Sequence, residues 1–95
     1  MSDIQIPEGN PRAVEARNQH TVNKLCIYYN YQKLINDEPR RKGAGKAINV
    51  VKSCSVFLES ANQAIRLKYI NNFFSKFIEE CKDEQNPSAL VELGL

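Results

Sequence analysis

The sequence lacks the long apolar runs that mark membrane and secreted proteins. No run approaches the roughly 18 apolar residues of a spanning helix, and residues 1–4 do not begin the basic-then-apolar order of a signal peptide. We therefore expect neither membrane insertion nor secretion, and an intracellular location. The 95 residues are also too few for a two-domain enzyme, or for a barrel or doubly wound sheet of ordinary size. One small core is expected.

Histidine and cysteine are too scarce to build a metal site. His20 is the one histidine, and Cys26, Cys54 and Cys81 form no C-x-x-C pair. A structural zinc ion needs a full set of nitrogen or sulfur ligands close together, so the sequence predicts no metal and no other cofactor. Each cysteine falls on an apolar stripe, which in a reducing compartment is typical of a buried free thiol.

Apolar residues recur at steps of three and four, and no stretch alternates with a period of two. This pattern predicts an all-α, compact four-helix domain over residues 12–86. We expect a long helix over residues 12–35, interrupted near His20, and a second helix from just after Pro39 to about residue 55. A short third helix is capped by Ser60 with Gln63, and a fourth carries the apolar stripe of residues 70–81.

The ends of the chain differ from this helical part. Residues 1–11 contain little apolar surface and two prolines, which indicates a flexible N-terminal arm. Residues 87–95 are a short C-terminal segment that is either a fifth helix or the start of a longer chain. The predicted core consists of the apolar residues on the helical stripes: Val14, Val22, Leu25, Cys26, Tyr29, Leu34, Ile35, Ala44, Ala47, Ile48, Val51, Cys54, Ala61, Ala64, Ile65, Ile70, Phe73, Phe74, Phe77, Ile78 and Cys81.

The cations are concentrated in one block of the chain. Residues 39–78 carry eight basic residues against Glu59 alone, a net charge of +7, whereas residues 1–38 carry −1 and residues 79–95 carry −4. Such a block is typical of a surface that meets phosphates, because each neutralised phosphate releases condensed counterions. The alternative is a solvated face balanced in space by the acidic ends. The candidate phosphate-binding residues are Arg40, Arg41, Lys42, Lys46, Lys52, Arg66, Lys68 and Lys76.

One string within this block carries a family resemblance. It reads Lys46-Ala47-Ile48-Asn49-Val50-Val51-Lys52-Ser53 and continues without a gap through Ser60, Ala61, Ala64 and Leu67 to Ile78-Glu79-Glu80. Over about residues 40–81 the chain resembles the small N-terminal domain of the family X DNA polymerases, the beta, lambda and terminal-transferase group. The resemblance implies a helix-hairpin-helix that binds backbone phosphates of gapped or single-stranded DNA, in a nuclear DNA repair protein.

The hairpin departs from the pattern of that family. The family reads apolar-Pro-Gly-apolar-Gly, whereas residues 67–71 read Leu-Lys-Tyr-Ile-Asn, without either glycine. We expect Asn71 and Asn72 to substitute in part, because asparagine tolerates the left-handed region and can cap the following helix. Both are therefore added to the candidate nucleic-acid-binding residues. Tyr69 in the tight position indicates a hairpin rebuilt for a different contact.

A second departure concerns catalysis. Family members that remove a 5′-deoxyribose phosphate use a lysine on the last helix as a Schiff-base nucleophile. The ungapped match places Phe77 at that position, and Lys76 lies one residue away, about 100° around the helix. The supporting basic residue is matched by Arg40 and the aromatic near it by Ala44. We therefore expect no lyase activity, and Lys76 is the one candidate nucleophile if the match shifts by a residue.

Two functions fit the sequence. The first is a DNA-binding module that contacts phosphates without reading sequence and has no catalysis of its own. The second is a helical protein-interaction domain that docks a partner on Tyr69, Phe73 and Phe74. Since Phe73 and Phe74 are adjacent, they cannot both point along one line of a helix, and one is free to act as an exposed anchor. Tyr28, Tyr29 and Tyr31 are either base-stacking rings or half-buried helix residues.

Overall fold

The computed structural model describes residues 9–85, and this part of the chain is helical without strands. The elements are a short 3-10 helix η1 (Ala16–Asn18), then α1 (Gln19–Leu34), α2 (Glu38–Ser53), α3 (Ala61–Ala64) and α4 (Asn72–Gln85). The all-α prediction with four helices is confirmed. Most of the predicted arm and the whole segment 87–95 lie outside the described residues. No helix within residues 9–85 combines the length and apolar character needed to cross a bilayer.

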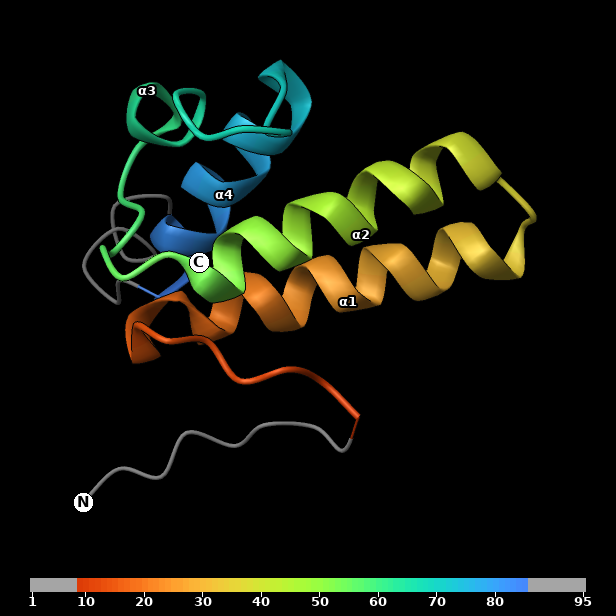
Figure 1. The fold of residues 1–95 in the computed structure, drawn as a ribbon, viewed down its shortest axis with the longest axis horizontal. Coiled ribbons are helices and arrows are strands. Elements are labelled where there is room, and N and C mark those ends of the chain that lie inside the picture. The colour runs from red at the N-terminus through yellow and green to blue at the C-terminus, as the bar shows by residue number, and fades with distance from the viewer. Residues whose placement is uncertain (1–8, 86–95) are drawn as a thin grey trace.

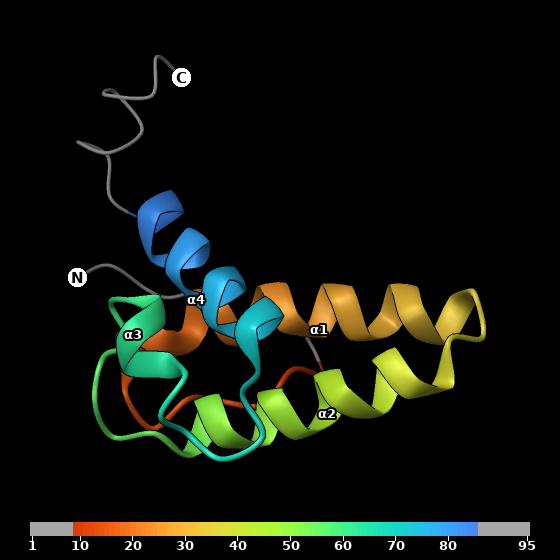
Figure 2. The same cartoon turned by 90° about the horizontal axis from the view of Figure 1, so that it is seen from above.

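α1 and α2 form a long antiparallel hairpin, and α3 and α4 lie against one half of it (Figure 1). The view from above shows the other half of the hairpin extending beyond α3 and α4 (Figure 2). The turn between α1 and α2 is possible because Asn36 adopts a positive φ of 61°, which asparagine tolerates better than most residues. The fold therefore has a covered inner half and an uncovered outer end.

α2 begins at Glu38, whereas the sequence predicted a start after Pro39. The difference arises because Asp37 caps the helix by accepting a hydrogen bond from the Arg40 N–H at 3.2 Å. Pro39 then lies in the first turn, where its missing N–H would have had no helical partner. α1 ends at Leu34, one residue earlier than predicted.

Small residues let α2 approach its neighbours closely. Ala44 and Ala47 are fully buried, and a Cβ added at Gly43 would lie 3.6 Å from the ring of Phe74. The rest of the core is supplied by apolar side chains of all four helices and of the two connections after α2, and by one alanine that precedes η1. Its members are Ala13, Val22, Leu25, Cys26, Ile48, Val51, Leu58, Ala64, Ile70, Phe74 and Ile78.

Several residues assigned to the core by periodicity are exposed. Val14 is 71% exposed because it precedes η1 and does not share the helical phase of α1. Leu34 and Ile35 are exposed because they lie at the outer end of the hairpin, beyond α4. Ile65 and Phe73 are also exposed, and Cys54 is only half-buried at the end of α2. Cys26 and Cys81 are buried thiols outside any disulfide, as predicted.

A buried polar pair joins the N-terminal segment to the core. The interruption expected near His20 lies just before it, where η1 gives way to α1 at Asn18 and Gln19. The Asn18 amide donates to the Val56 carbonyl at 2.9 Å and accepts from the Leu58 N–H at 3.0 Å. Gln19 accepts from the Ala13 N–H at 2.7 Å and donates to the Pro11 carbonyl at 3.0 Å. These two side chains hold segments that have no helical hydrogen bonds of their own.

The caps of the last two helices follow the sequence signals. The Ser60 hydroxyl accepts a hydrogen bond from the Gln63 N–H at 3.1 Å, which confirms the predicted cap of α3. The Gln63 side chain returns to the Glu59 N–H at 2.9 Å, one residue before the position of an ordinary capping box. The Asn71 side chain accepts from the Phe74 N–H at 2.9 Å and so caps α4, as expected.

Candidate nucleic-acid interface

The turn between α3 and α4 contains a strained residue. Tyr69 has a φ of 68°, and the expectation that Asn71 or Asn72 would take the left-handed conformation is wrong. For a bulky residue this conformation costs about 1–2 kcal/mol, because Cβ crowds the following carbonyl oxygen. The next residue, Ile70, is buried, whereas Tyr69 is 54% exposed. The buried isoleucine thus anchors the turn while the tyrosine ring faces solvent.

Two lysines from different elements lie over the Tyr69 ring. The Lys46 ammonium, from α2, is 5.3 Å from the ring centroid, and the Lys68 ammonium, from the turn itself, is 5.1 Å from it. Both distances fall within the range of a cation–π contact. The ring therefore joins the charged face of α2 to the turn before α4.

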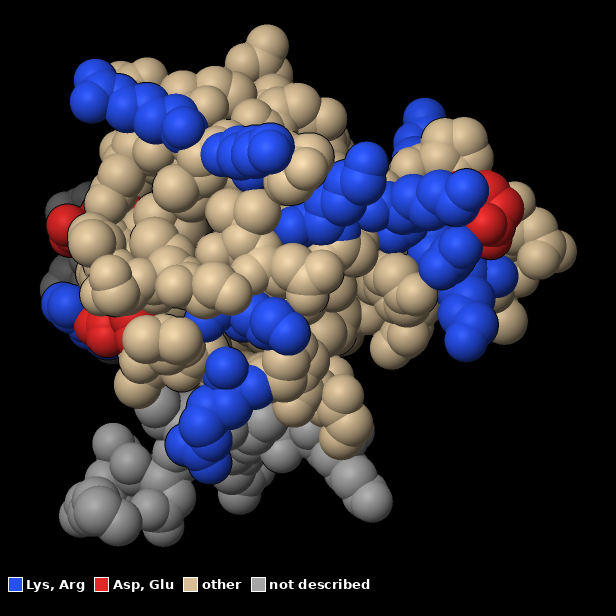
Figure 3. Space-filling model, in the orientation of Figure 1, with Lys and Arg blue, Asp and Glu red and all other residues tan. Residues whose placement is uncertain are grey.

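The exposed face of α2 extends this cluster along the helix. Lys42 and Lys46 are both exposed and lie four residues apart, on one side of α2. Figure 3 shows lysine and arginine side chains crossing this face of the molecule in a broken band, which is densest at the outer end of the hairpin. We call Lys42, Lys46, Lys68 and Tyr69 the lysine–tyrosine cluster.

Two of the predicted phosphate-binding residues form ion pairs with carboxylates at the start of α2. Arg40 donates to Asp37 at 2.6 Å, and Arg41 donates two hydrogen bonds to Glu38 at 2.9 and 2.7 Å. The hydrogen bond from Arg40 lowers the pKa of Asp37, and that from Arg41 lowers the pKa of Glu38. Each carboxylate therefore stays ionised to a lower pH than it would without its arginine. These arginines are partly neutralised at the outer end of the hairpin.

The remaining predicted cations do not all converge. Within residues 9–85, none of Lys42, Lys46, Lys52, Arg66, Lys68 and Lys76 forms an ion pair with a carboxylate. Lys52 is half-buried, and its position six residues after Lys46 places it about 120° around α2. Arg66 is exposed between α3 and the turn, and Asn71 and Asn72 are exposed at the start of α4. The structure thus brings Lys46 and Lys68 together and leaves Lys52 apart.

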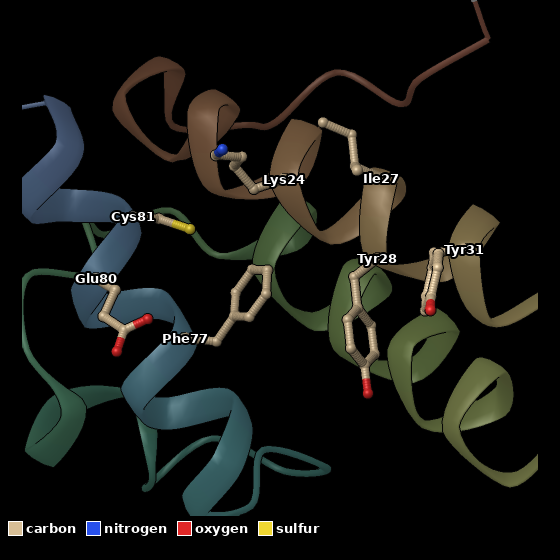
Figure 4. A pocket seen from close by; sticks show the side chains of 7 residues that line it. All are labelled: Lys24, Ile27, Tyr28, Tyr31, Phe77, Glu80 and Cys81. Atoms are coloured by element: carbon tan, nitrogen blue, oxygen red, sulfur yellow. The ribbon is translucent and has the colours of Figure 1, made fainter.

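An apolar groove lies between α1 and α4, away from the lysine–tyrosine cluster (Figure 4). Its volume is about 370 Å³, and Phe77 points from α4 toward α1 in it. The groove is lined by Lys24, Ile27, Tyr28, Tyr31, Phe77, Glu80 and Cys81. The ring centroids of Tyr28 and Phe73 are 5.5 Å apart at its edge. Half-buried Tyr28 thus packs in an aromatic cluster, whereas Tyr31 remains 56% exposed.

The adjacent residues Phe73 and Phe74 differ in solvent exposure, as the protein-interaction hypothesis requires. Phe74 is buried and Phe73 is 51% exposed, so one ring packs in the core while the other is accessible. Phe73 also borders a shallow cavity of about 180 Å³ that Lys76, Phe77 and Glu80 share. The expected separation of the two rings is confirmed.

Lys76 is placed poorly for nucleophilic chemistry. It is exposed on α4, beside this shallow cavity. A Schiff-base lysine is activated by a desolvated pocket or by a second cation close by. Lys76 is exposed, and the other residues that line its cavity are Phe73, Phe77 and Glu80, none of them a cation. Phe77, at the position matched to the nucleophile, is half-buried against the core.

We expect no covalent adduct when the protein is treated with borohydride in the presence of a 5′-deoxyribose phosphate end on DNA. A Schiff base needs a neutral amine held against the sugar aldehyde. Lys76 is instead exposed at the border of a shallow cavity. The measurement is the mobility of labelled DNA on a denaturing gel. An adduct that forms with the unmodified protein and disappears with Lys76→Ala would contradict this expectation and identify a lyase.

Comparisons with known proteins give no match: no family model, no curated protein and no solved structure is similar to this chain. The resemblance to the family X polymerases therefore stays a prediction from the sequence.

Proposed function

We propose that this domain binds nucleic acid, and DNA in particular, by contacting backbone phosphates without reading sequence and without catalysis of its own. The observation that carries the proposal is the lysine–tyrosine cluster, in which exposed cations of α2 and of the turn before α4 meet at one ring. The choice of DNA, the nuclear location and a role in DNA repair rest on the family resemblance alone.

The placement of charge supports phosphate as the ligand. Lys42 and Lys46 lie one helical turn apart, about 6 Å along the axis of α2, so their ammonium groups can reach neighbouring phosphates of one strand. Flexible lysine stems suit a ligand that varies in sequence, because they contact phosphate as point charges. Within residues 39–78 only Glu59 opposes these charges. The nearby carboxylates of Asp37 and Glu38 are already engaged by Arg40 and Arg41.

The double variant Lys42→Glu with Lys46→Glu is expected to weaken binding to a labelled oligonucleotide by about 30-fold at physiological salt. Each lost phosphate contact also removes about one unit from the slope of log affinity against log salt. The unmodified protein should give a slope of roughly −3, and the double variant a slope near −1. Fluorescence anisotropy across a salt series measures both quantities.

The matched control changes the same amount of charge elsewhere. Arg12→Glu with Lys33→Glu also reverses two exposed cations, but both lie outside residues 39–78. We expect this control to bind within about threefold of the unmodified protein at physiological salt, where distant surface charges are screened. Equal losses in the two double variants, or binding that does not depend on salt, would overturn the proposal. If a protein partner is retained equally by both, the interaction-domain hypothesis is favoured instead.

A further inference from the structure

We propose that Tyr69 is a stacking platform for one unpaired base, so that the ligand of the lysine–tyrosine cluster is single-stranded nucleic acid. This inference rests on the proposed function, because it assigns the kind of strand that the same surface binds. The ring would stack on the base, while Lys46 and Lys68 would move to the phosphates on either side.

The backbone conformation points to a role for the ring outside the core. Tyr69 is held at a φ of 68°, a conformation that is a genuine outlier for a bulky side chain. More than half of the side chain is exposed, and the adjacent Ile70 provides the buried anchor of the turn. Packing therefore does not explain a tyrosine at this position, where asparagine or glycine would be less strained. Strained residues of this kind concentrate at ligand-binding sites.

A nucleotide base can replace the lysine ammonium groups that lie over the Tyr69 ring. Within residues 9–85 the ring makes cation–π contacts with the ammonium groups of Lys46 and Lys68, at 5.3 and 5.1 Å. An exposed cation–π contact is weaker than the stacking of a base on an aromatic ring. A base can therefore displace a lysine from the ring, and the displaced ammonium gains a phosphate oxygen. The exchange thus replaces the ring contact of a lysine with a contact to phosphate.

The strand must be unpaired at this point. A base inside a duplex has both faces covered by its neighbours in the stack, so its face is not available to the ring. A single strand presents bases of any identity, and stacking on them tolerates sequence because every base has a π-face. A stacking role for Tyr69 thus agrees with binding that does not read sequence. It restricts the ligand to nucleic acid with unpaired bases, as in single strands, flaps or gaps.

The test compares two oligomers of about 12 nucleotides with the same phosphates, one of thymidines and one of abasic sugar units. The unmodified protein and Tyr69→Phe, which keeps the ring, are expected to bind the thymidine oligomer about tenfold tighter than the abasic oligomer. Tyr69→Asn removes the ring but suits the left-handed backbone. This variant should bind both oligomers with the affinity that the unmodified protein has for the abasic oligomer. Anisotropy gives the affinities, and a circular dichroism melt of each variant checks that the fold is kept.

The outcomes separate this inference from the proposed function. If the unmodified protein binds both oligomers equally well and the Lys42→Glu, Lys46→Glu variant still loses affinity, phosphate binding stands and the stacking role of Tyr69 is wrong. A base-dependent preference that persists in Tyr69→Asn likewise overturns the assignment to Tyr69. If neither oligomer binds, the proposed function and this inference both fail. Should Tyr69→Asn melt at a lower temperature, Tyr69→Gly provides the same comparison with an unstrained backbone.

Discussion

Replacing Asn18 with alanine is expected to lower the free energy of unfolding by about 2–4 kcal/mol. The Asn18 side chain is fully buried and hydrogen-bonded to the main chain of Val56 and Leu58. Its removal leaves the buried Leu58 N–H without a partner, and an unsatisfied buried group costs about 1–3 kcal/mol. The connection between α2 and α3 would also lose a fixed path. Urea unfolding followed by circular dichroism measures the change.

Asn62→Ala is the matched control for this substitution. Asn62 is exposed on α3, and no hydrogen bond of its side chain is recorded within residues 9–85, so we expect a change within about 0.5 kcal/mol. Similar losses in the two variants would show that the Asn18 hydrogen bonds contribute little. In that case the connection after α2 would be held by Leu58 in the core.

Phe74→Ala is expected to be the most destabilising single change, with a loss of about 3–5 kcal/mol. The Phe74 ring is buried against Gly43 of α2 and lies 5.9 Å, edge to face, from the ring of Tyr28 on α1. Truncation would leave a cavity where three helices meet. Because a domain of this size is stable by only about 5–10 kcal/mol, the loss should be visible both in thermal melting and in the urea midpoint.

The neighbouring residue supplies the comparison. Phe73→Ala removes the same side chain one position earlier, from a site that is half exposed. We expect a loss of about 1 kcal/mol, from the ring contacts with Tyr28 and Phe77. If the two alanine variants were equally stable, the arrangement of α4 against α1 and α2 described above would be incorrect.

Periodicity and caps predicted most of the fold from the sequence. The apolar stripe predicted over residues 70–81 placed the buried side of α4, since its members Ile70, Phe74, Ile78 and Cys81 are buried. Ser60 marked the start of α3. These signals are local, since a helix of this kind is specified by its own apolar spacing and by its first turn. They were misleading for Leu34 and Phe73, where burial depends on whether another helix covers that side.

The burial of the polar residues in the core was not predicted from the sequence. Asn18 and Gln19 are as buried as the core leucines Leu25 and Leu58, but asparagine and glutamine are usually exposed, so neither was a core candidate. Their partners lie far along the chain or in segments without periodicity, as Leu58 and Ala13 do. A signal was nevertheless present, because the apolar pattern loses its phase between Val14 and Val22.

The candidate site could be predicted in part. The sequence located the basic block and singled out Tyr69, but it counted Arg40 and Arg41 as equal to the lysines. Their spacing of three residues from Asp37 and Glu38 already indicated helical ion pairs. That Lys46 and Lys68 share one ring could not be predicted, because it depends on how α2 meets the turn before α4.

The uneven coverage of the α1–α2 hairpin divides its amide hydrogens into two groups. Around Val22 and Val51, where α3 and α4 cover the hairpin, exchange with water requires the whole domain to open. Around Asn36, residues 33–36 are exposed in the part of the chain that the structure describes, so the last turns can fray while the core stays intact. The covered inner half of the domain is therefore rigid, whereas the outer end of the hairpin opens locally. The lysine–tyrosine cluster lies on the covered half.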